Sequence, residues 1–132
     1  MPNLEHVFTH KNLDCAIVNN ETHRCGYVGV PKDHPLHGKN YNDVLEDYDI
    51  SVHGGLTYSS SETSEEYPIY KKDIWWFGYD CAHYNDNLEI CTLDFCIQEC
   101  KNLANNLDEI AVNQRQQKLK NIKPTTTLTH TL

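Results

Sequence analysis

Long hydrophobic stretches are missing from this sequence: no segment approaches the roughly 18 consecutive apolar residues that a membrane-spanning helix needs. The N-terminus also lacks a basic segment followed by an apolar one, so it does not look like a secretion signal. We therefore expect a soluble protein of the cytoplasm. In that compartment the six cysteines are expected to be free thiols and not disulfides.

Basic residues are also scarce. The chain has 11 Lys and Arg against 19 Asp and Glu, which gives a formal net charge of −8. Binding to duplex nucleic acid depends on Lys and Arg that replace counterions along the phosphates. We therefore expect no direct nucleic-acid partner and no membrane partner.

The length of 132 residues fits one domain, and the order of patterns favours an α+β fold with a small antiparallel sheet and one long C-terminal helix packed on it. We expect a flexible lead-in at residues 1–12, a single α+β domain at 13–112, and a polar helix extension and tail at 113–132. The tail is expected to follow Pro124.

Short runs of β-branched and aromatic residues predict the strands. Residues 13–18 and 24–31 flank a polar turn and predict a hairpin, and residues 49–58 alternate between apolar and polar positions. Residues 42–48 predict a helical turn, and the Ser- and Glu-rich segment 59–66 predicts an exposed, mobile loop.

The segment Asp73–Asp86 is the centre of the predicted fold. Its large apolar residues occupy both faces of a strand, which is typical of a strand covered on both sides. It ends in Asp80, Cys81, His83 and Asp86, so a buried strand opens onto a polar site.

The C-terminal helix is predicted to begin at Thr92, a good N-cap residue, and apolar residues then recur every three or four positions. Cys96 and Cys100 stand on this apolar stripe and are explained as small buried hydrophobes. Structural zinc sites usually bring two closely spaced ligand pairs, and the cysteines do not offer two such pairs. We therefore predict no metal ligands and no cofactor.

Histidines and carboxylates near the predicted strand ends suggest a site. His53 lies on the polar face of the 49–58 segment, and with Asp80, His83 and Asp86 it could form an acid/base or metal centre. Structural roles for these groups are the more common outcome. The sequence therefore predicts no catalytic residues.

Aromatic residues close to polar ones favour a pocket for a small planar ligand, held by stacking and hydrogen bonds. The predicted ligand-binding residues are Arg24, Tyr27, Tyr41, His53, Thr57, Asp80, His83 and Tyr84.

Three segments carry a resemblance to known proteins: C-G-Y-V-G-V-P to H-P-L-H-G-K-N-Y at 25–41, V-H-G-G-L-T-Y at 52–58, and W-W-F-G-Y-D-C-A-H at 75–83. Together they resemble a family of small proteins of bacteriophages, prophages and some bacteria. The resemblance brings no activity with it. It implies a phage-type accessory protein in the cytoplasm of a bacterial host, a setting in which many small proteins counter host defences.

Three functions follow from these patterns. The first is a counter-defence protein that binds and sequesters a small nucleotide-derived immune signal. The second is a small hydrolase of such a signal, with His53 or His83 as the base. The third is an acidic inhibitor of a host defence protein, acting through Glu62, Glu65 and Glu66. Binding is favoured over catalysis, and a homo-oligomer stays open because the helix from Leu93 has a long polar continuation.

Overall fold

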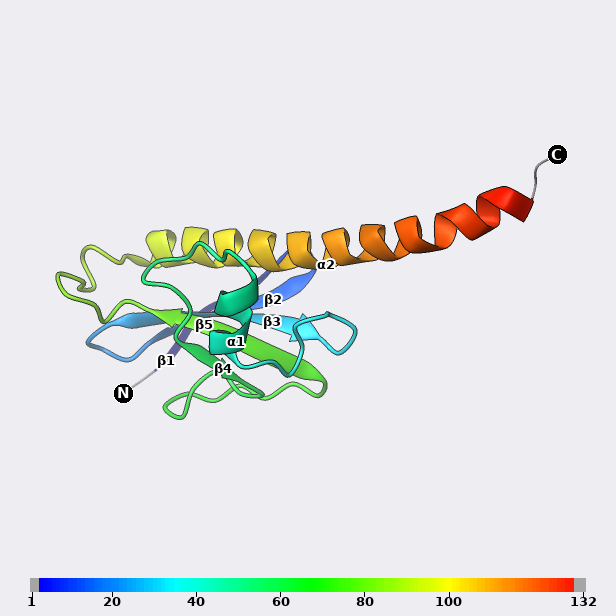
Figure 1. Cartoon of the computed structure of the whole chain (residues 1–132). Helices are drawn as coiled ribbons and strands as arrows, with labels where there is room; N and C mark the ends of the chain where they lie inside the picture. The colour runs from blue at the N-terminus through cyan, green and yellow to red at the C-terminus, as the bar shows by residue number, and fades with distance from the viewer. Residues whose placement is uncertain (1–2, 130–132) are drawn as a thin grey trace.

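A computed structural model describes the backbone of residues 3–129 and the side chains as far as residue 121. A five-stranded antiparallel sheet has the order β1-β2-β3-β5-β4, and the long helix α2 lies across one of its faces (Figure 1). The elements are β1 Asn3–His10, β2 Leu13–Asn19, β3 Arg24–Pro31, α1 Tyr41–Asp47, β4 Tyr58–Ser60, β5 Ile74–Asp80 and α2 Leu93–Thr129. The predicted α+β class, with its sheet and C-terminal helix, is confirmed.

The predicted hairpin is β2 and β3, which pair from Asn19 opposite Arg24 to Asp14 opposite Gly29. Its turn is closed by Asn20, whose side-chain oxygen accepts hydrogen bonds from the backbone N–H groups of Thr22 and His23. A short amide that satisfies nearby backbone donors is what makes Asn common in turns.

The flexible lead-in predicted at residues 1–12 is wrong for its described part. Asn3–His10 forms the edge strand β1, which pairs along its length with β2. The apolar pattern of β1 is weak because an edge strand with one exposed face needs few apolar residues. Backbone pairing holds it, together with an ion pair between Glu5 and Arg24 of β3.

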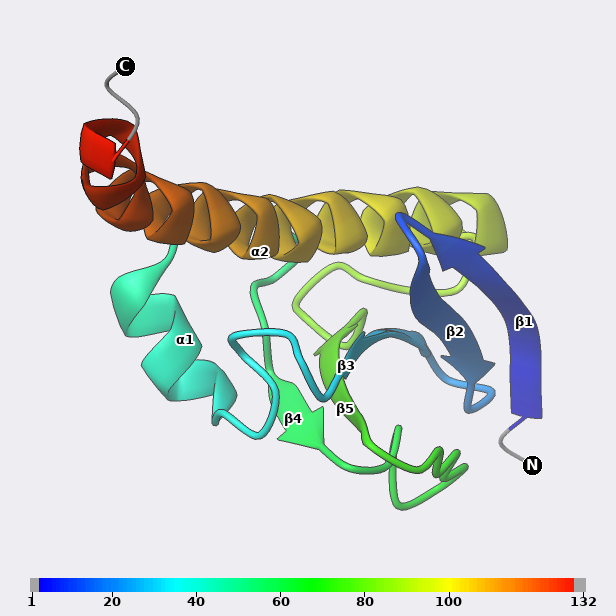
Figure 2. The same cartoon turned by 90° about the vertical axis from the view of Figure 1, so that its right-hand side faces the viewer.

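Both faces of the sheet are covered, as predicted for the strand at 74–80. Phe77 and Tyr79 of β5 point into the large core under α2, and Trp76 points into a smaller cluster on the opposite face. We call these the α2 face and the loop face. Figure 2 shows α2 on one side of the sheet and the segment that follows β4 on the other.

Helix α2 begins as predicted. The Thr92 hydroxyl oxygen accepts a hydrogen bond from the Phe95 backbone N–H at 3.1 Å, which is an N-cap contact. The residues of its buried stripe are Cys96, Cys100, Leu103, Ala104, Leu107 and Ala111. The predicted placement of Cys96 and Cys100 in the core is therefore confirmed.

The strand predicted at 49–58 is wrong for most of its length, since only Tyr58 belongs to a strand. Gly54 and Gly55 have φ values of +69° and +80° and turn the chain away from an extended path. Ile50 and Leu56 are still buried, but against the core under α2 and not through strand pairing. The alternation of apolar and polar residues in this segment therefore accompanies a turn and not a strand.

The exposed loop predicted at 59–66 also needs correction. Tyr58–Ser60 forms β4, and Thr63 is fully buried. The Thr63 hydroxyl donates to the Tyr67 carbonyl at 2.7 Å and accepts from the Ile69 N–H at 2.9 Å. Thr63 therefore fixes the segment that covers the loop face.

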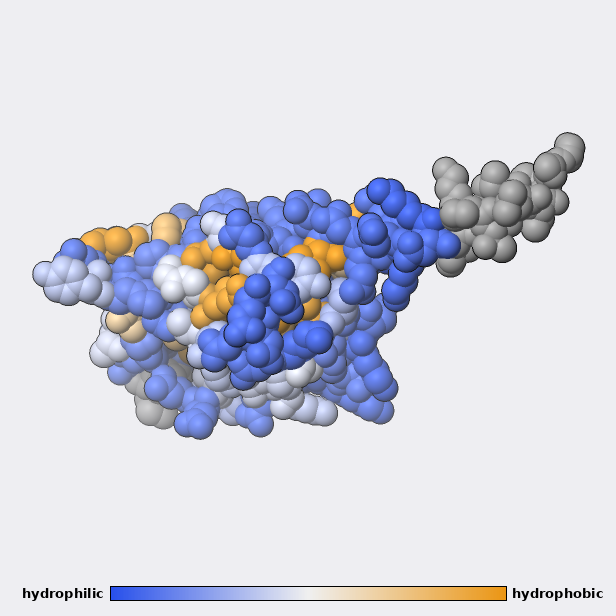
Figure 3. All heavy atoms as spheres, viewed as in Figure 1, coloured by the Kyte–Doolittle hydropathy of each residue, from blue (hydrophilic) through white to orange (hydrophobic). Residues whose placement is uncertain are grey.

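The predicted helical turn at 42–48 is α1. The predicted polar helix extension is present, because residues 113–121 continue α2 and are all exposed. The helix runs on to Thr129, so the predicted tail after Pro124 is helical in its described part, and residues 130–132 lie outside the described residues. Figure 3 shows hydrophobic residues between α1 and α2 and a hydrophilic surface on α2 further along. Neither described helix combines the length and apolarity that crossing a membrane requires.

Candidate functional site

Two adjoining hollows open beside the end of β5, on the side of the sheet away from α2. Their volumes are about 270 and 300 Å³, and both are lined by His23, Cys25, Tyr27 and Tyr58. The hollow of about 300 Å³ is also lined by Thr57, Tyr79, Asp80 and Ala82. The hollow of about 270 Å³ is also lined by Val18, Asn20, Ser64, Glu65 and Glu66. We call the combined hollow the tyrosine cavity. Each hollow by itself is close to the lower end of the roughly 300–1,000 Å³ usual for small-molecule sites.

The rings of Tyr27 and Tyr58 form the apolar wall of this cavity. They meet edge to face, with centroids 5.6 Å apart and an interplanar angle of 82°. Gly78 of β5 makes room for the Tyr27 ring, since a Cβ atom at Gly78 would come within 2.7 Å of it. Burial raises the pKa of the Tyr27 hydroxyl above its ordinary value and the pKa of the Cys25 thiol to about 12. Both groups are therefore neutral at physiological pH.

Asp80 supplies a fixed carboxylate at the edge of the cavity. One oxygen accepts a hydrogen bond from the Thr57 hydroxyl at 2.8 Å, and the other accepts from the Ala82 N–H at 3.0 Å. Glu65 and Glu66 line the neighbouring hollow, and neither hollow has a Lys or Arg in its lining. The cavity is thus suited to a ligand that donates hydrogen bonds.

A second group of polar side chains adjoins Asp80 on the α2 side. His53 Nε2 lies 2.9 Å from a carboxylate oxygen of Asp86, and His83 Nε2 lies 3.5 Å from Asp80. The two imidazole rings meet edge to face, with centroids 5.8 Å apart. The structure therefore brings His53, Asp80 and His83, which the sequence singled out, together with Asp86. We call these four residues the His/Asp cluster.

The local fold holds each imidazole in place. The backbone N–H of His53 donates to Glu99 of α2 at 2.7 Å, and the Phe95 ring packs against the His53 ring with centroids 5.3 Å apart. His83 lies over Gly54, where a side-chain Cβ would overlap its ring. The double glycine thus has a specific role, which is to turn the chain and leave space for His83.

Asp86 was not among the predicted ligand-binding residues, although the H-x-x-D spacing from His83 was a signal for it. The N–H of His83 donates to the Asp86 carboxylate at 3.0 Å, and the N–H of Asp86 donates to the His83 carbonyl at 2.8 Å. Burial on its own would raise the pKa of the Asp86 carboxyl, but hydrogen bonds from His53 and His83 bring it below the ordinary value. Asp86 is therefore an ionised partner for His53.

Two thiols lie beside the same imidazole. Cys91 Sγ is 3.8 Å from His53 Nε2, and one donor atom each from His53, Cys81 and Cys91 lies within 4.8 Å of the other two. A Cys-His-Asp relay would use both ring nitrogens. Here Cys91 and Asp86 approach the same one. Burial also raises the pKa of Cys91, so its thiol is not activated as a nucleophile.

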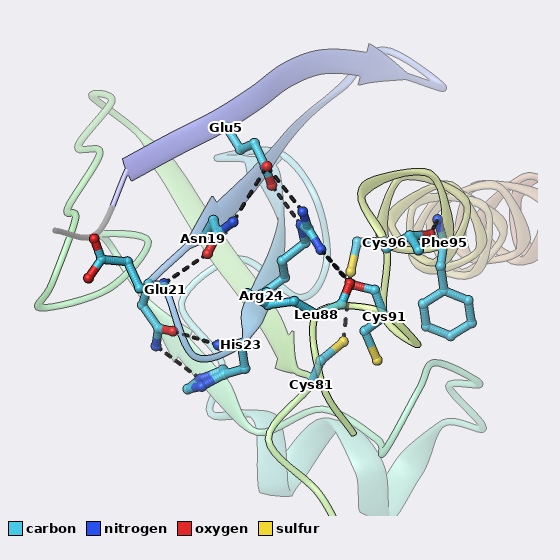
Figure 4. Close-up of polar contacts among 12 residues, drawn as sticks. Glu5, Asn19, Glu21, His23, Arg24, Cys81, Leu88, Cys91, Phe95 and Cys96 are labelled. Atoms are coloured by element: carbon cyan, nitrogen blue, oxygen red, sulfur yellow. Dashed lines mark hydrogen bonds and ion pairs between the residues drawn. The ribbon is translucent and has the colours of Figure 1, made fainter. Parts of the chain in front are cut away.

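Three of the predicted ligand-binding residues lie apart from both groups. The Arg24 guanidinium donates to Glu5 and to the carbonyls of Leu88 and Cys91, so it connects β1, β3 and the segment before α2 (Figure 4). Tyr41 begins α1 and packs at the margin of the large core. The Tyr84 side chain is 94% exposed. By contrast, Tyr27, Thr57 and Asp80 all line the tyrosine cavity.

Sequence reasoning missed His23, Cys25 and Tyr58 as lining residues. They come from the hairpin turn, from the start of β3 and from β4, and they meet only because β3 and β4 both pair with β5. A scan against protein-family models and searches of curated proteins and of solved structures gave no match to this chain.

Proposed function

We propose that this protein binds and sequesters a small nucleotide-derived molecule, and that the tyrosine cavity holds the base of that molecule. The observation that carries the proposal is that Tyr27, Thr57 and Asp80 line one hollow together with Tyr58. Aromatic rings stack on a base, and a carboxylate accepts hydrogen bonds from an amino group on its edge. A role against host defence is the context that the resemblance to small phage proteins suggests.

The charge of the cavity restricts which part of the ligand enters it. Asp80, Glu65 and Glu66 are acidic, and no Lys or Arg lines either hollow. Two like charges 4 Å apart repel by about 4 kcal/mol at the effective dielectric constant of a protein surface. Phosphate groups should therefore lie outside the cavity, and a ligand with few phosphates should bind better than a polyphosphate.

Isothermal titration of the full chain with nucleosides, cyclic nucleotides, ADP-ribose and nucleoside triphosphates tests this proposal. We expect binding of at least one molecule with an amino-bearing base, and the weakest binding for triphosphates. Tyr58→Leu keeps much of the side-chain volume but removes stacking worth about 1 kcal/mol, so affinity should fall about fivefold. Tyr70→Leu is the matched control, because the Tyr70 side chain is 64% exposed.

Two results would overturn the proposal. One is an absence of binding heat and of any thermal shift across the whole panel. The other is equal loss of affinity in Tyr58→Leu and Tyr70→Leu, because that would place the ligand elsewhere.

Hydrolysis of the bound molecule is the second candidate function. Asp80 lines the cavity and also lies 3.5 Å from His83, whose side chain is 40% exposed and therefore accessible to water. A carboxylate that orients an imidazole next to a ligand site is a common arrangement for a general base. His83→Asn should then abolish product formation and change the dissociation constant less than twofold. If the wild-type protein returns every ligand of the panel unchanged, sequestration remains and hydrolysis is excluded.

A further inference from the structure

Three side chains with metal-ligating atoms, those of Cys81, Cys91 and Asp86, lie around the imidazole of His53. A carboxylate oxygen of Asp86 lies 2.9 Å from His53 Nε2, and Cys91 Sγ lies 3.8 Å from it. The donor atoms of His53, Cys81 and Cys91 are all within 4.8 Å of one another. We propose that His53, Cys81 and Cys91, with Asp86 at the fourth position, bind a thiophilic divalent cation, Zn²⁺ above all.

Hydrogen bonding alone does not account for this gathering. A ring nitrogen carries at most one hydrogen, so Nε2 cannot donate to both a carboxylate and a thiol with good geometry. Hydrogen bonds from His53 and His83 explain the position of Asp86, but thiols are weak hydrogen-bond partners, so such bonds do not explain two thiols beside the same imidazole. The Asp86 side chain is only 8% exposed and both thiols are 1% exposed. A cation placed among His53, Cys81 and Cys91 would bind the ring nitrogen and both sulfur atoms, and Asp86 would approach it from its contact with His53 Nε2.

The spacing between the Cys91 sulfur and the His53 ring nitrogen fits a tetrahedral site. With Zn–S bonds of about 2.3 Å and Zn–N bonds of about 2.0 Å, neighbouring ligand atoms lie about 3.5–3.8 Å apart. The Cys91 Sγ to His53 Nε2 distance of 3.8 Å already has this value. Thiolate and imidazole ligands select zinc over the harder magnesium and calcium ions.

Each proposed ligand is positioned by contacts of its own. The Cys81 N–H donates to the Arg24 carbonyl, and the Arg24 guanidinium donates to the Cys91 carbonyl at 2.8 Å, so one residue places both cysteines. Glu99 holds the His53 backbone, and His83 holds Asp86. Figure 4 shows the Cys81 side chain next to Cys91, which belongs to the segment that Arg24 anchors. Such preorganisation is what a metal site needs.

Cys96 is a neighbour and not a proposed ligand. Its sulfur lies 3.7 Å from Cys81 Sγ on the buried stripe of α2. Asp86 is the better fourth ligand because it already contacts His53 Nε2. Binding releases the two thiol protons of Cys81 and Cys91 to solvent, so the cation faces two thiolates, one carboxylate and a neutral imidazole. Affinity should consequently rise with pH.

The first measurement is the zinc content of the purified full chain, by elemental mass spectrometry. The second is the absorption spectrum of the protein after zinc has been replaced with Co²⁺. We expect about one zinc per chain and a thiolate-to-cobalt charge-transfer band. Cys81→Ser and Cys91→Ser should lose both signals, with affinity reduced by more than the roughly 10–100-fold cost of losing an outer partner. Cys100→Ala is the matched control. Cys100 of α2 is as buried as Cys81 and Cys91, but its sulfur contacts Tyr27 and Tyr79 and not His53.

His53→Asn and Asp86→Asn keep the proposal testable if the cysteine variants do not fold. A folded His53→Asn variant with full zinc content would overturn the assignment. Equal metal content in wild type and Cys91→Ser would overturn it too, as would a wild-type chain without metal and without the cobalt band. If a thiol titration of the unfolded, unreduced protein finds two thiols fewer than the chain has cysteines, the result would instead indicate a disulfide. Ligand binding in the tyrosine cavity is a separate measurement, so either proposal can fail alone.

Discussion

The two faces of the sheet are built differently. The α2 face is covered by a long helix whose stripe packs on Phe77, Tyr79 and the inward residues of β2 and β3. On the loop face the buried residues are Ala16, Val18, Tyr27 and Trp76, and the cover is a loop that contributes Tyr67 and Ile69. A helix satisfies its own backbone hydrogen bonds and can seal a large apolar area, whereas a loop covers less and leaves hollows. The tyrosine cavity accordingly lies on the loop face.

The largest expected effect is on the α2 face. Leu103→Ala removes a fully buried side chain from the stripe and should lower the free energy of unfolding by about 2–5 kcal/mol. Leu119→Ala on the same helix is the control, because Leu119 is 65% exposed and its loss should cost less than about 0.5 kcal/mol. Urea denaturation measures both. Similar costs for the two variants would show that the α2 face does not carry the stability of the fold.

A smaller effect is expected where β1 and β3 meet the segment before α2. Glu5→Gln removes the ion pair to Arg24, and we expect a cost of about 1–3 kcal/mol at neutral pH. The hydrogen bond from Arg24 holds the pKa of Glu5 below its ordinary value of 4.5. The stabilisation is therefore fully present above pH 4.5 and is lost as the pH falls through the lowered pKa.

Urea denaturation of wild type and Glu5→Gln between pH 7 and pH 3 checks this prediction. The stability difference should be constant near neutrality and should shrink at acid pH. A difference that grows on acidification contradicts the assigned role of the ion pair.

The buried Thr63 hydroxyl fixes the segment that covers the loop face. Thr63→Ala removes hydrogen bonds to Tyr67 and Ile69, and we expect a cost of about 1–2 kcal/mol. Because the cover of the cavity is loosened, ligand affinity should fall with stability, while metal content should not change. Calorimetry of unfolding and of ligand binding measures the two effects. Ser61→Ala, at an exposed position, is the control. Unaltered affinity in a destabilised Thr63→Ala variant would separate the cover from the cavity.

The most local effect distinguishes two neighbouring glycines. Both have positive φ, so Gly54→Ala and Gly55→Ala should each cost about 1–2 kcal/mol in backbone strain. A methyl group at Gly54 would overlap the His83 ring, whereas none of the described atoms lies near one at Gly55. Only Gly54→Ala should therefore change the NMR signals of the His83 ring. Identical His83 spectra for the two variants would contradict the close approach of His83 to Gly54.

Much of the fold could be predicted from local patterns. The hairpin, the strand at 74–80 and the start of α2 at Thr92 follow from alternation, from a continuous apolar run and from a capping residue. The strand β1 and the turn at Gly54 could not be predicted in this way. Pairing with β2 stabilises β1. In the segment around Gly54, Ile50 and Leu56 are apolar because they pack against the core under α2. Both depend on neighbours that a local pattern does not contain.

The same distinction between local sequence and tertiary structure applies to the candidate site. The amino-acid sequence by itself determined the chemistry on offer: a short stretch with Asp80, Cys81, His83 and Asp86, a histidine before two glycines, and an acidic, aromatic-rich chain. Tertiary structure alone decided that Asp80 faces a cavity with Tyr27 and Tyr58, that His53 meets Asp86 and two thiols, and that Arg24 is used to join three segments. The physical reason is that residue types fix which protons and ligand atoms exist, whereas distances between them depend on strand order and helix packing across the whole chain.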